Sequence, residues 1–334
     1  MKSLELIIPV LNEEDCLPAL LVRLNQIRTQ LENSHTLSVL FVNDGSSDLS
    51  EVIMNEACAT YEWVRLISFS RNFGHQAAIT AGINNTEADF VMILDADLQD
   101  PPELAQQMLL EVEKGADIVF GKRLSRKGET LFKRTTAKAF YWFLSHAVRI
   151  DIPTDTGDFR LITRKVVLAL RGMKEKHRFI RGMVPWTGFK SVPLFYERDA
   201  RFAGETKFTI FKMFRFSMDA IFSFSIFPLR LSTSLGLCMT AFGALGGMLM
   251  LYFRLFTTYT VPGITAVLLA IVIMNGIQNI MLGICGEYIG RIYEQVKDRP
   301  LYVVGYSRNL GQVAHLPHLP KEENVSASFQ KIPG

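Results

Sequence analysis

A short apolar run that ends in two closely spaced carboxylates is the feature that most constrains this chain. Residues 91–94 have the composition and length of a buried strand, and Asp95 and Asp97 follow at once. In a strand, residues i and i+2 point to the same face, so both carboxylates could bind one hard cation. The alternative is a plain acidic turn. The pattern favours a site for a metal ion and a phosphate group.

From Met1 to about Val119 the chain alternates short apolar runs with helical patterns. Strands are predicted over residues 4–10, 37–42, 63–69, 90–94 and 117–120, and helices over residues 13–31, 49–61, 75–84 and 102–114. Such alternation predicts an α/β fold, in which helices cover both faces of a mostly parallel sheet. Parallel sheets bind ligands beyond the carboxyl ends of their strands.

Polar segments follow four of these predicted strands and should meet at one edge of the sheet. They are Pro9–Glu14, Asn43–Asp48, Ser70–Gly74 and Asp95–Asp97. None is a GxGxxG or Walker loop, which argues against dinucleotide oxidoreductases and P-loop enzymes. Residues 44–48 by themselves are equally compatible with a turn and helix N-cap, or with contacts to a base and to phosphates.

Charge, cysteines and the N-terminus narrow the functional class. A net charge of +3 indicates no global field for nucleic acid, so no nucleic-acid partner is expected. The four cysteines are widely separated and form no CxxC pair, which predicts free thiols in a reducing compartment. The first residues have a strand pattern without a basic segment, so no signal peptide is expected and this part should stay in the cytosol.

Two long stretches without charged residues, 231–253 and 255–286, dominate the later chain. About 20 apolar residues form one membrane span, so we expect two transmembrane helices joined by a turn near residues 257–262. The alternative is a buried helical hairpin of a soluble domain. Lys and Arg residues flank the pair on both outer sides, whereas the turn region carries only Arg254. Both termini should therefore face the cytosol.

Two segments rich in basic and aromatic residues precede these spans. Residues of about 129–148 and 205–230 have the composition of helices that lie in a membrane interface. A helix packed on the soluble core is the alternative for the first of them. Both would seat the N-terminal domain on the anionic cytosolic leaflet. The predicted divisions are a domain over 1–204, an interface helix over 205–230, two transmembrane helices over 231–286 and a cytosolic tail over 287–334.

Further acids and bases gather between the two basic segments. Asp155, Asp158 and Arg160 lie in a glycine-bearing loop before a helix predicted over residues 164–170. Helix capping explains one of the two acids but not both. The basic run Lys174–Gly182 could cover a substrate phosphate, or it could be a solvated charge run.

The order of these motifs is similar to that of family 2 glycosyltransferases with the GT-A (Rossmann-like) fold. The motifs are Pro9–Glu14, Val42–Asp48, Phe69–Ala78, Leu94–Glu103 and Asp158–Leu161. Together with the two spans they resemble the polyisoprenyl-phosphate glycosyltransferases: bactoprenol glucosyltransferases, aminoarabinose-type transferases and dolichol-phosphate mannose synthases. The resemblance runs from about residue 4 to residue 308. The Gln-x-x-Arg-Trp motif of processive synthases is absent near Trp186, so transfer of a single sugar is favoured.

This resemblance implies a membrane-bound enzyme and assigns roles to residues. The implied reaction is inverting, metal-dependent transfer of one hexose, with glucose from UDP-glucose preferred, to a polyprenyl phosphate such as undecaprenyl phosphate. It would take place at the cytosolic face of the inner (plasma) membrane, in a homo-oligomer such as a tetramer. The implied catalytic residues are Asp158, Asp97 and Asp95, with Mg²⁺ or Mn²⁺ held by Asp97, Asp95 and Gln99. The implied nucleotide-sugar contacts are Pro9, Leu11, Asn12, Glu13, Asp44, Asp48, Asn72, Asp95 and Ala96.

The acceptor phosphate would bind Arg123, Arg134 and Arg201, because guanidinium groups form paired bonds with phosphate oxygens. A phosphomonoester has its second pKa near about 6 and is largely dianionic at pH 7, so it needs little help from a general base. Asp158 could therefore orient substrate or take a proton. The alternatives to glucose transfer are GDP-mannose or a UDP-aminosugar as donor. A non-catalytic flippase subunit or scaffold is the alternative outside the enzyme class.

Overall fold

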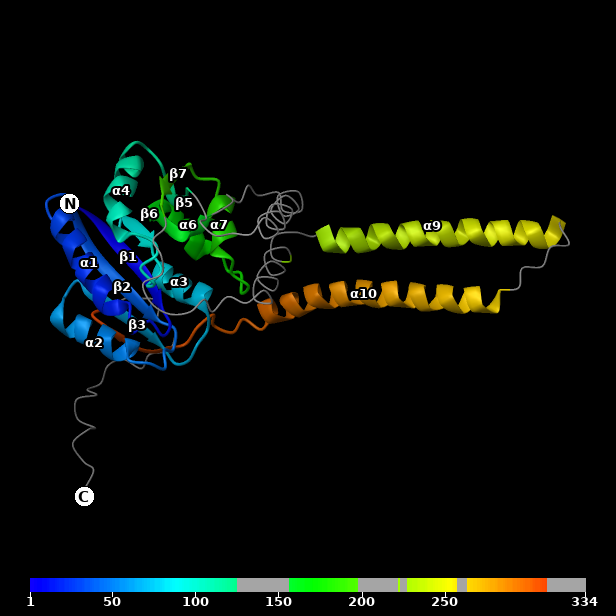
Figure 1. Ribbon diagram of the computed structural model, residues 1–334, viewed down its shortest axis with the longest axis horizontal. Coiled ribbons are helices and arrows are strands. Elements are labelled where there is room, and N and C mark those ends of the chain that lie inside the picture. Colours follow the sequence, from blue (N-terminus) through cyan, green and yellow to red (C-terminus); the bar gives the residue numbers. More distant parts are fainter. Residues whose placement is uncertain (125–155, 198–221, 223–226, 257–262, 311–334) are drawn as a thin grey trace, which may run out of the picture. The chain divides into compact units, whose positions relative to one another are not determined.

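The computed structural model describes residues 1–124, 156–197, 222, 227–256 and 263–310 (Figure 1). The chain divides into two compact units. The sheet unit takes the described residues up to 197 together with 300–310, and the helical unit takes those from 222 to 299. The segment predicted over about 129–148, most of 205–230, and with them Asp155, Arg134 and Arg201, lie outside the described residues.

One sheet of eight strands forms the base of the sheet unit. Its strands are β1 (Lys2–Val10), β2 (His35–Asn43), β3 (Val64–Phe69), β4 (Phe90–Ile93), β5 (Ile118–Arg123), β6 (Thr156–Thr163), β7 (Ser191–Tyr196) and β8 (Val304–Arg308). The order across the sheet is β7-β5-β6-β4-β1-β2-β3-β8. Only β6 and β8 run antiparallel to their neighbours. The predicted mostly parallel sheet is confirmed.

Helices connect the parallel strands, as the alternating pattern predicts. The helices of the sheet unit are α1 (Leu17–Leu31), α2 (Ser50–Thr60), α3 (His75–Asn84), the short 3-10 helix η1 (Pro102–Leu104), α4 (Ala105–Glu113), α6 (Arg164–Gly172) and α7 (Ile180–Trp186). In α1 the apolar positions recur at helical spacing, and Pro18 stands in the first turn, where its missing N–H leaves no bond unmade. The predicted ends of the first four helices agree with these bounds to within a few residues.

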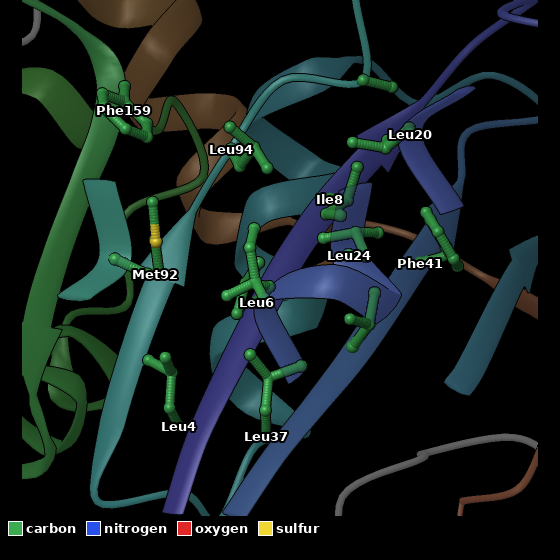
Figure 2. Close-up of a cluster of buried hydrophobic side chains, with 14 of the residues drawn as sticks. Leu4, Leu6, Ile8, Leu20, Leu24, Leu37, Phe41, Met92, Leu94 and Phe159 are labelled. Carbon is green, nitrogen blue, oxygen red and sulfur yellow. The ribbon is translucent and has the colours of Figure 1, made fainter. Parts of the chain in front are cut away.

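The central strand β1 packs different helices on its two faces because successive side chains alternate. Leu4, Leu6 and Ile8 lie in one apolar cluster with buried residues of α1, α2 and α4 (Figure 2). Each of these three side chains is fully buried and contributes roughly 1.5–3 kcal/mol to folding. On the opposite face, a Cβ added to Gly82 of α3 would lie 2.3 Å from Ile7, so only glycine lets α3 approach this closely.

Strand β6 corrects the prediction of a glycine-bearing loop at residues 155–161. It lies between β4 and β5 and pairs antiparallel with both. Its residues 157–162 are buried, with Phe159 and Leu161 alternating with the polar Asp158 and Arg160. A buried acid and a buried base hide the apolar pattern by which a strand is recognised in sequence. At the edge where β5 ends, Lys122 stands opposite Thr156, the first residue of β6.

The C-terminal part of the chain also differs from the predicted tail over residues 287–334. Helix α10 (Ile264–Val296) continues past residue 287, and β8 then pairs with β3 at the end of the sheet. The sheet unit is therefore not confined to residues 1–204. Strands β7 and β8 were missed because each has only five or six residues and lies at a margin of the sheet, where one side is exposed.

The helical unit consists of α9 (Phe227–Phe256) and α10, which lie side by side (Figure 1). Within the described chain, residues 227–253 are the one helical stretch that is long and apolar enough to cross a membrane, with a mean hydropathy of 1.7. Many large apolar side chains of both helices are exposed, among them Leu237, Phe242, Ile280 and Ile289. Many exposed apolar side chains on one unit mark a surface that contacts a membrane or another protein. The second predicted span stays a prediction.

Candidate functional site

The carboxyl ends of β1 to β5 and β7 lie at one edge of the sheet, and the amino ends of β6 and β8 reach the same edge. This is the edge at which parallel sheets bind ligands. The four predicted polar segments lie here, joined by the start of β6, which carries Asp158. The convergence predicted from the sequence is confirmed.

The loops after β1 and β2 are joined to each other by hydrogen bonds. Asn12 Oδ1 accepts the N–H of Ser47 at 2.8 Å, and Asn12 N–H donates to Ser46 Oγ at 3.1 Å. Asp48 accepts the N–H of Glu14 and, through its other oxygen, the N–H of Ser50 in the first turn of α2. These bonds fix the shape of the two loops without any ligand.

Asp44 is buried and accepts hydrogen bonds from the loop after β3. Its Oδ1 accepts the N–H groups of Phe73 at 2.7 Å and Gly74 at 3.1 Å, and its Oδ2 accepts that of Gly74 at 3.0 Å. Burial raises the pKa of Asp44, while these two backbone N–H groups lower it. Next to it, Gly45 has φ +71°, and a Cβ there would lie 2.6 Å from the backbone carbon of Arg71. Loops 43–48 and 70–74 therefore meet only because residue 45 is glycine.

The remaining residues predicted to contact the nucleotide sugar lie in the same loops or in the core beside them. Pro9 is buried within β1 and stands opposite Val42. Leu11 is half-buried, and Ala96 belongs to the apolar core. Glu13 N–H donates to Ser50 Oγ at 2.8 Å, and Asn72 carries the loop backbone that lies against Gly45. All lie at the same edge, but Pro9 and Ala96 can offer a ligand little beyond backbone.

A cluster of charged side chains surrounds Asp158. Arg181 of α7 donates from Nε to Asp158 Oδ1 at 3.0 Å and from Nη2 to Oδ2 at 2.8 Å. His75, the first residue of α3, places Nε2 at 3.2 Å from Asp158 Oδ2 and at 3.6 Å from Asp95 Oδ1. Asp158 is 1% exposed, whereas His75 and Arg181 are 42% and 33% exposed. One face of the cluster is therefore open to a ligand.

The cations of this cluster outweigh the cost of burying its carboxylate. Burial alone would raise the pKa of Asp158, but Arg181 and His75 hold it far below its usual range. Burial would likewise lower the pKa of His75, but the hydrogen bond to Asp158 and the charge of Asp95 raise it to about 9. Arg160, which donates to the carbonyl oxygens of Gly157 and Asp158, has its pKa lowered to about 10 by burial.

Asp95 and Asp97 have different environments. Since β4 ends at Ile93, the strand rule that puts residues i and i+2 on one face does not apply to them. Asp97 Oδ1 accepts the N–H of Gln99 at 3.2 Å, across a turn in which Leu98 has φ 59°. Asp95 Oδ1 is buried and accepts no hydrogen bond from the described residues. Burial, together with the neighbouring carboxylates, raises the pKa of Asp95.

These two carboxylates suit a divalent cation in chemistry. Mg²⁺ and Mn²⁺ prefer carboxylate and other oxygen ligands, and a cation would favour the charged form of Asp95. Among the described residues no group of three His, Cys, Asp or Glu side chains is arranged to hold a metal ion. A substrate diphosphate and water would then supply further ligands, as is usual for Mg²⁺. The orphaned oxygen of Asp95 fits such a group.

Of the three predicted phosphate-binding arginines, the structure describes Arg123. Its Nε lies 3.5 Å from the hydroxyl of Tyr196, which in turn donates to Asp100. A Cβ on Gly157 would lie 3.1 Å from Arg123 Nη2, next to Asp158 in the chain. Successive side chains of a strand point to opposite faces, so this contact places Arg123 at the same sheet edge but does not join it to the charged cluster.

Three residues of this edge were missed in the sequence: His75, Arg181 and Tyr196. His75 lies inside the motif Phe69–Ala78, and its place after a strand-end glycine was the available signal. Arg181 lies in the basic run whose role was left open. The end of that run begins α7 (Ile180–Trp186), and the N–H of Ile180 donates to Gln76 Oε1 at 2.8 Å. Nothing in the sequence marks Tyr196 as a partner of Asp100, 96 positions away.

Comparison with known proteins gives consistent matches along the chain. The model of the family described as glycosyl transferase family 2 matches residues 5–171. The glycosyltransferase YkcC of Bacillus subtilis is 46% identical over 90% of this chain and 92% of its own length. The bactoprenol glucosyl transferase of Shigella phage SfII is 36% identical, over 90% of this chain and 97% of its own. A prophage bactoprenol glucosyl transferase homolog of Escherichia coli is 35% identical, over 90% and 98%.

Similarity to solved structures is weaker. The glucosyl-3-phosphoglycerate synthase of Mycobacterium tuberculosis, in complex with Mn²⁺, UDP and glucosyl-3-phosphoglycerate, is 16% identical. It covers 66% of this chain and 78% of its own, with a TM-score of 0.43. This likeness is too low to carry an argument about function.

Proposed function

Because this chain belongs to glycosyl transferase family 2, we propose that it transfers a single hexose, with inversion, from a nucleotide sugar to a polyprenyl phosphate. UDP-glucose is the preferred donor and undecaprenyl phosphate the preferred acceptor. The observation that carries the proposal is the open charged cluster of Asp158, Arg181, His75 and Asp95 at the ligand-binding edge of the sheet. A glycosyltransferase is thus favoured over a non-catalytic flippase subunit or scaffold.

The acceptor class rests on relatives that match nearly the whole chain. The bactoprenol glucosyl transferases match about nine tenths of it, so the similarity extends well beyond the sheet unit into the helical unit. Bactoprenol is named as the acceptor lipid of those proteins. A lipid acceptor agrees with the exposed apolar side chains of α9 and α10.

The donor nucleotide binds at the loops after β1, β2 and β3 in this proposal. Asn12, Asp44, Asp48 and Asn72, with the segment Pro9–Glu13, contact the base and ribose. A carboxylate has about four acceptor positions, and Asp44 uses three of them on the N–H groups of loop 70–74. The loops are already joined by hydrogen bonds, so little ordering cost remains when the nucleotide binds.

Mg²⁺ or Mn²⁺ would be held by Asp97 and Asp95, with Gln99 as a further ligand. When bound, such an ion neutralises charge on the departing nucleoside diphosphate. The chain supplies two carboxylates here: His75 lies 3.6 Å from Asp95, and Asp97 accepts the N–H of Gln99.

Asp158 orients groups in the site and does not take a proton in this proposal. Both its oxygens accept hydrogen bonds, from the Arg181 guanidinium and from His75. The polyprenyl phosphate acceptor is largely dianionic at pH 7, since the second pKa of a phosphomonoester is about 6. The carboxylate therefore holds Arg181 and His75 toward the open face, where Arg123 can contact the acceptor phosphate together with Arg134 and Arg201.

The protein functions at the cytosolic face of the inner (plasma) membrane in this proposal. The catalytic residues lie within 1–204, interface helices cover about 129–148 and 205–230, and two spans lie within 231–286, while β8 completes the sheet. Both termini are cytosolic, and the chain assembles as a homo-oligomer such as a tetramer.

A donor panel tests the proposal. Purified full-length protein in nanodiscs is mixed with undecaprenyl phosphate and labelled UDP-glucose, GDP-mannose or a UDP-aminosugar, and the lipid extract is counted. Label should enter the lipid fraction from UDP-glucose, and Asp97→Asn should abolish it. Transfer from one of the other donors instead would show that the protein transfers that sugar and not glucose. The absence of label from every donor would contradict the function.

A further inference from the structure

The segment that follows α10 in the chain contacts loop 70–74, whose N–H groups bind Asp44. We define residues Tyr302–Asn309 as the C-terminal strap. Its strand β8 pairs antiparallel with β3, with Tyr306 opposite Ser68. Just before β8, the carbonyl oxygen of Val303 accepts the N–H of Ser70 at 3.0 Å. The C-terminal strap therefore meets loop 70–74 at its first residue.

Tyr302 packs against the residue that precedes this loop. It is 8% exposed, and its ring stacks on Phe69 with centroids 5.0 Å apart and an angle of 15°. Phe69 in turn meets Phe73 edge-on at 5.7 Å. The Tyr302 hydroxyl also accepts a long hydrogen bond of 3.4 Å from Asn84, the last residue of α3. Tyr302 thus contacts the strand before the loop and the helix after it.

The other end of the C-terminal strap is attached away from the loop. Tyr306 donates to Glu51 Oε1 at 2.6 Å and accepts from Asn55, both on α2. Asn309 Nδ2 lies 2.8 Å from the carbonyl oxygens of Cys58 and Val64. Tyr306 is therefore a natural control for Tyr302: the same residue type on the same strap, with partners that do not belong to the loop.

Loop 70–74 determines the positions of two groups in the site. Its Phe73 and Gly74 N–H groups bind Asp44, and its backbone lies against Gly45. His75 follows directly and reaches Asp95 and Asp158. Without the C-terminal strap, β3 would be an edge strand and the Ser70 N–H would lose its acceptor. The loop would then keep only its contacts with Asp44 and Gly45.

We infer that Tyr302 is a positioning residue for the donor site. With the carbonyl of Val303, it holds loop 70–74 in the conformation that binds Asp44 and carries His75 to the acids. The effect on turnover rests on the proposed function, whereas the effect on the loop does not. Aromatic pairs contribute beyond the area they bury, so the ring of Tyr302 is the group that matters most.

Hydrogen exchange of the full-length protein in nanodiscs tests the structural step. In Tyr302→Ala, peptides that cover residues 70–76 should exchange at least about tenfold faster than in the wild type, because local opening becomes easier. In Tyr306→Ala they should change by less than about twofold, and in Tyr302→Phe the wild-type rate should return. Equal acceleration in both alanine variants, or none in Tyr302→Ala, would overturn the inference.

Turnover gives the second measurement. Tyr302→Ala should raise KM for the nucleotide sugar about tenfold with a smaller change in kcat, because loop position affects donor binding first. Tyr302→Phe should restore KM, and Tyr306→Ala should leave it near the wild-type value. If the wild type transfers no sugar, the proposed function fails while hydrogen exchange still decides the role of Tyr302.

If Tyr302→Ala does not fold, Tyr302→Leu replaces it in both measurements, because leucine keeps apolar bulk without the ring stack. Exchange and KM at wild-type values in that variant would contradict the inference.

Discussion

Asp44 and Asp158 lie at the same edge of one sheet and are both buried, yet different donors surround them. Asp44 faces two backbone N–H groups of a neighbouring loop. Asp158 faces an arginine fork and a histidine. As a result burial raises the pKa of Asp44, whereas the cations hold that of Asp158 far below its usual range.

This difference separates two tasks within one site. The backbone N–H groups that bind Asp44 are neutral. They fix its position without placing a cation against it, so its carboxylate holds two loops together. Charged donors around Asp158 leave partly exposed cations at the rim, where an anionic substrate can meet them. In the proposed function, the side of Asp44 would then position the nucleotide by shape and the side of Asp158 would meet the acceptor by charge.

Removal of divalent metal should have the largest effect on the charged side. With a chelator present, turnover should fall to background because no ion offsets the charge on the leaving diphosphate. Adding Mg²⁺ or Mn²⁺ back should restore it. The measurement is labelled-lipid formation across a metal titration, with binding of the uncharged nucleoside as a control that chelation should not change. Full activity in the chelator would remove the metal from the proposal.

Asp158→Asn should have the next largest effect. It leaves the Arg181 guanidinium without its carboxylate partner, and kcat should fall by about 100-fold or more, as for loss of a preorganised electrostatic contact. The loss should persist as pH rises from about 7 to about 9, because the acceptor is already ionised. The check is a profile of kcat against pH; recovery of activity at high pH would show that Asp158 takes a proton.

Arg181→Lys should have a smaller effect, because it keeps the charge but not the fork. One of the two bonds to Asp158 is lost, and activity should fall by about ten- to 100-fold, as expected for the loss of one charge-assisted hydrogen bond. The matched control is Lys174→Arg, in the same basic run. Wild-type activity in both variants would show that the run acts only through its overall charge.

Asp44→Asn should have the smallest effect on kcat and a clear one on donor affinity. The amide oxygen can still accept one loop N–H, but the amide NH₂ group would face the other. KM for the nucleotide sugar should rise by about tenfold, and stability should fall by about 1–3 kcal/mol for the unmet hydrogen bond. Steady-state kinetics and chemical denaturation check both. A fall in kcat with KM unchanged would contradict the division of tasks.

The two sides also differ in how far the sequence predicts them. The loop of Asp44 has local turn chemistry: the positive φ of Gly45 fits a turn, and α2 begins at Ser50, one residue after the predicted start, although its N-cap is Leu49. The strand ends of the parallel sheet are predicted equally well, because alternating apolar runs need only neighbouring residues.

The cluster of Asp158 depends on long-range contacts and was only partly predicted. His75 is 83 positions from Asp158 in the chain. Arg181 reaches it only because β6 inserts antiparallel between β4 and β5, and that strand carries two buried charges. Charged residues argue against a buried strand until their partners are known. The acid was found in the sequence, but the cations that define its role were not.

The pairing of Lys122 with Thr156 has a consequence for how this protein could be altered. The chain leaves the sheet after β5 and returns to it at β6 with its two ends already adjacent, and the intervening stretch holds Arg134. The register of β5 against β6 is set by the strands themselves and by Lys122 opposite Thr156, and not by the length of the sequence between them. Exchanging residues 125–155 for those of a relative should therefore leave this register unchanged. In the proposed function, such an exchange would also test whether the stretch that holds Arg134 contributes to the choice of acceptor.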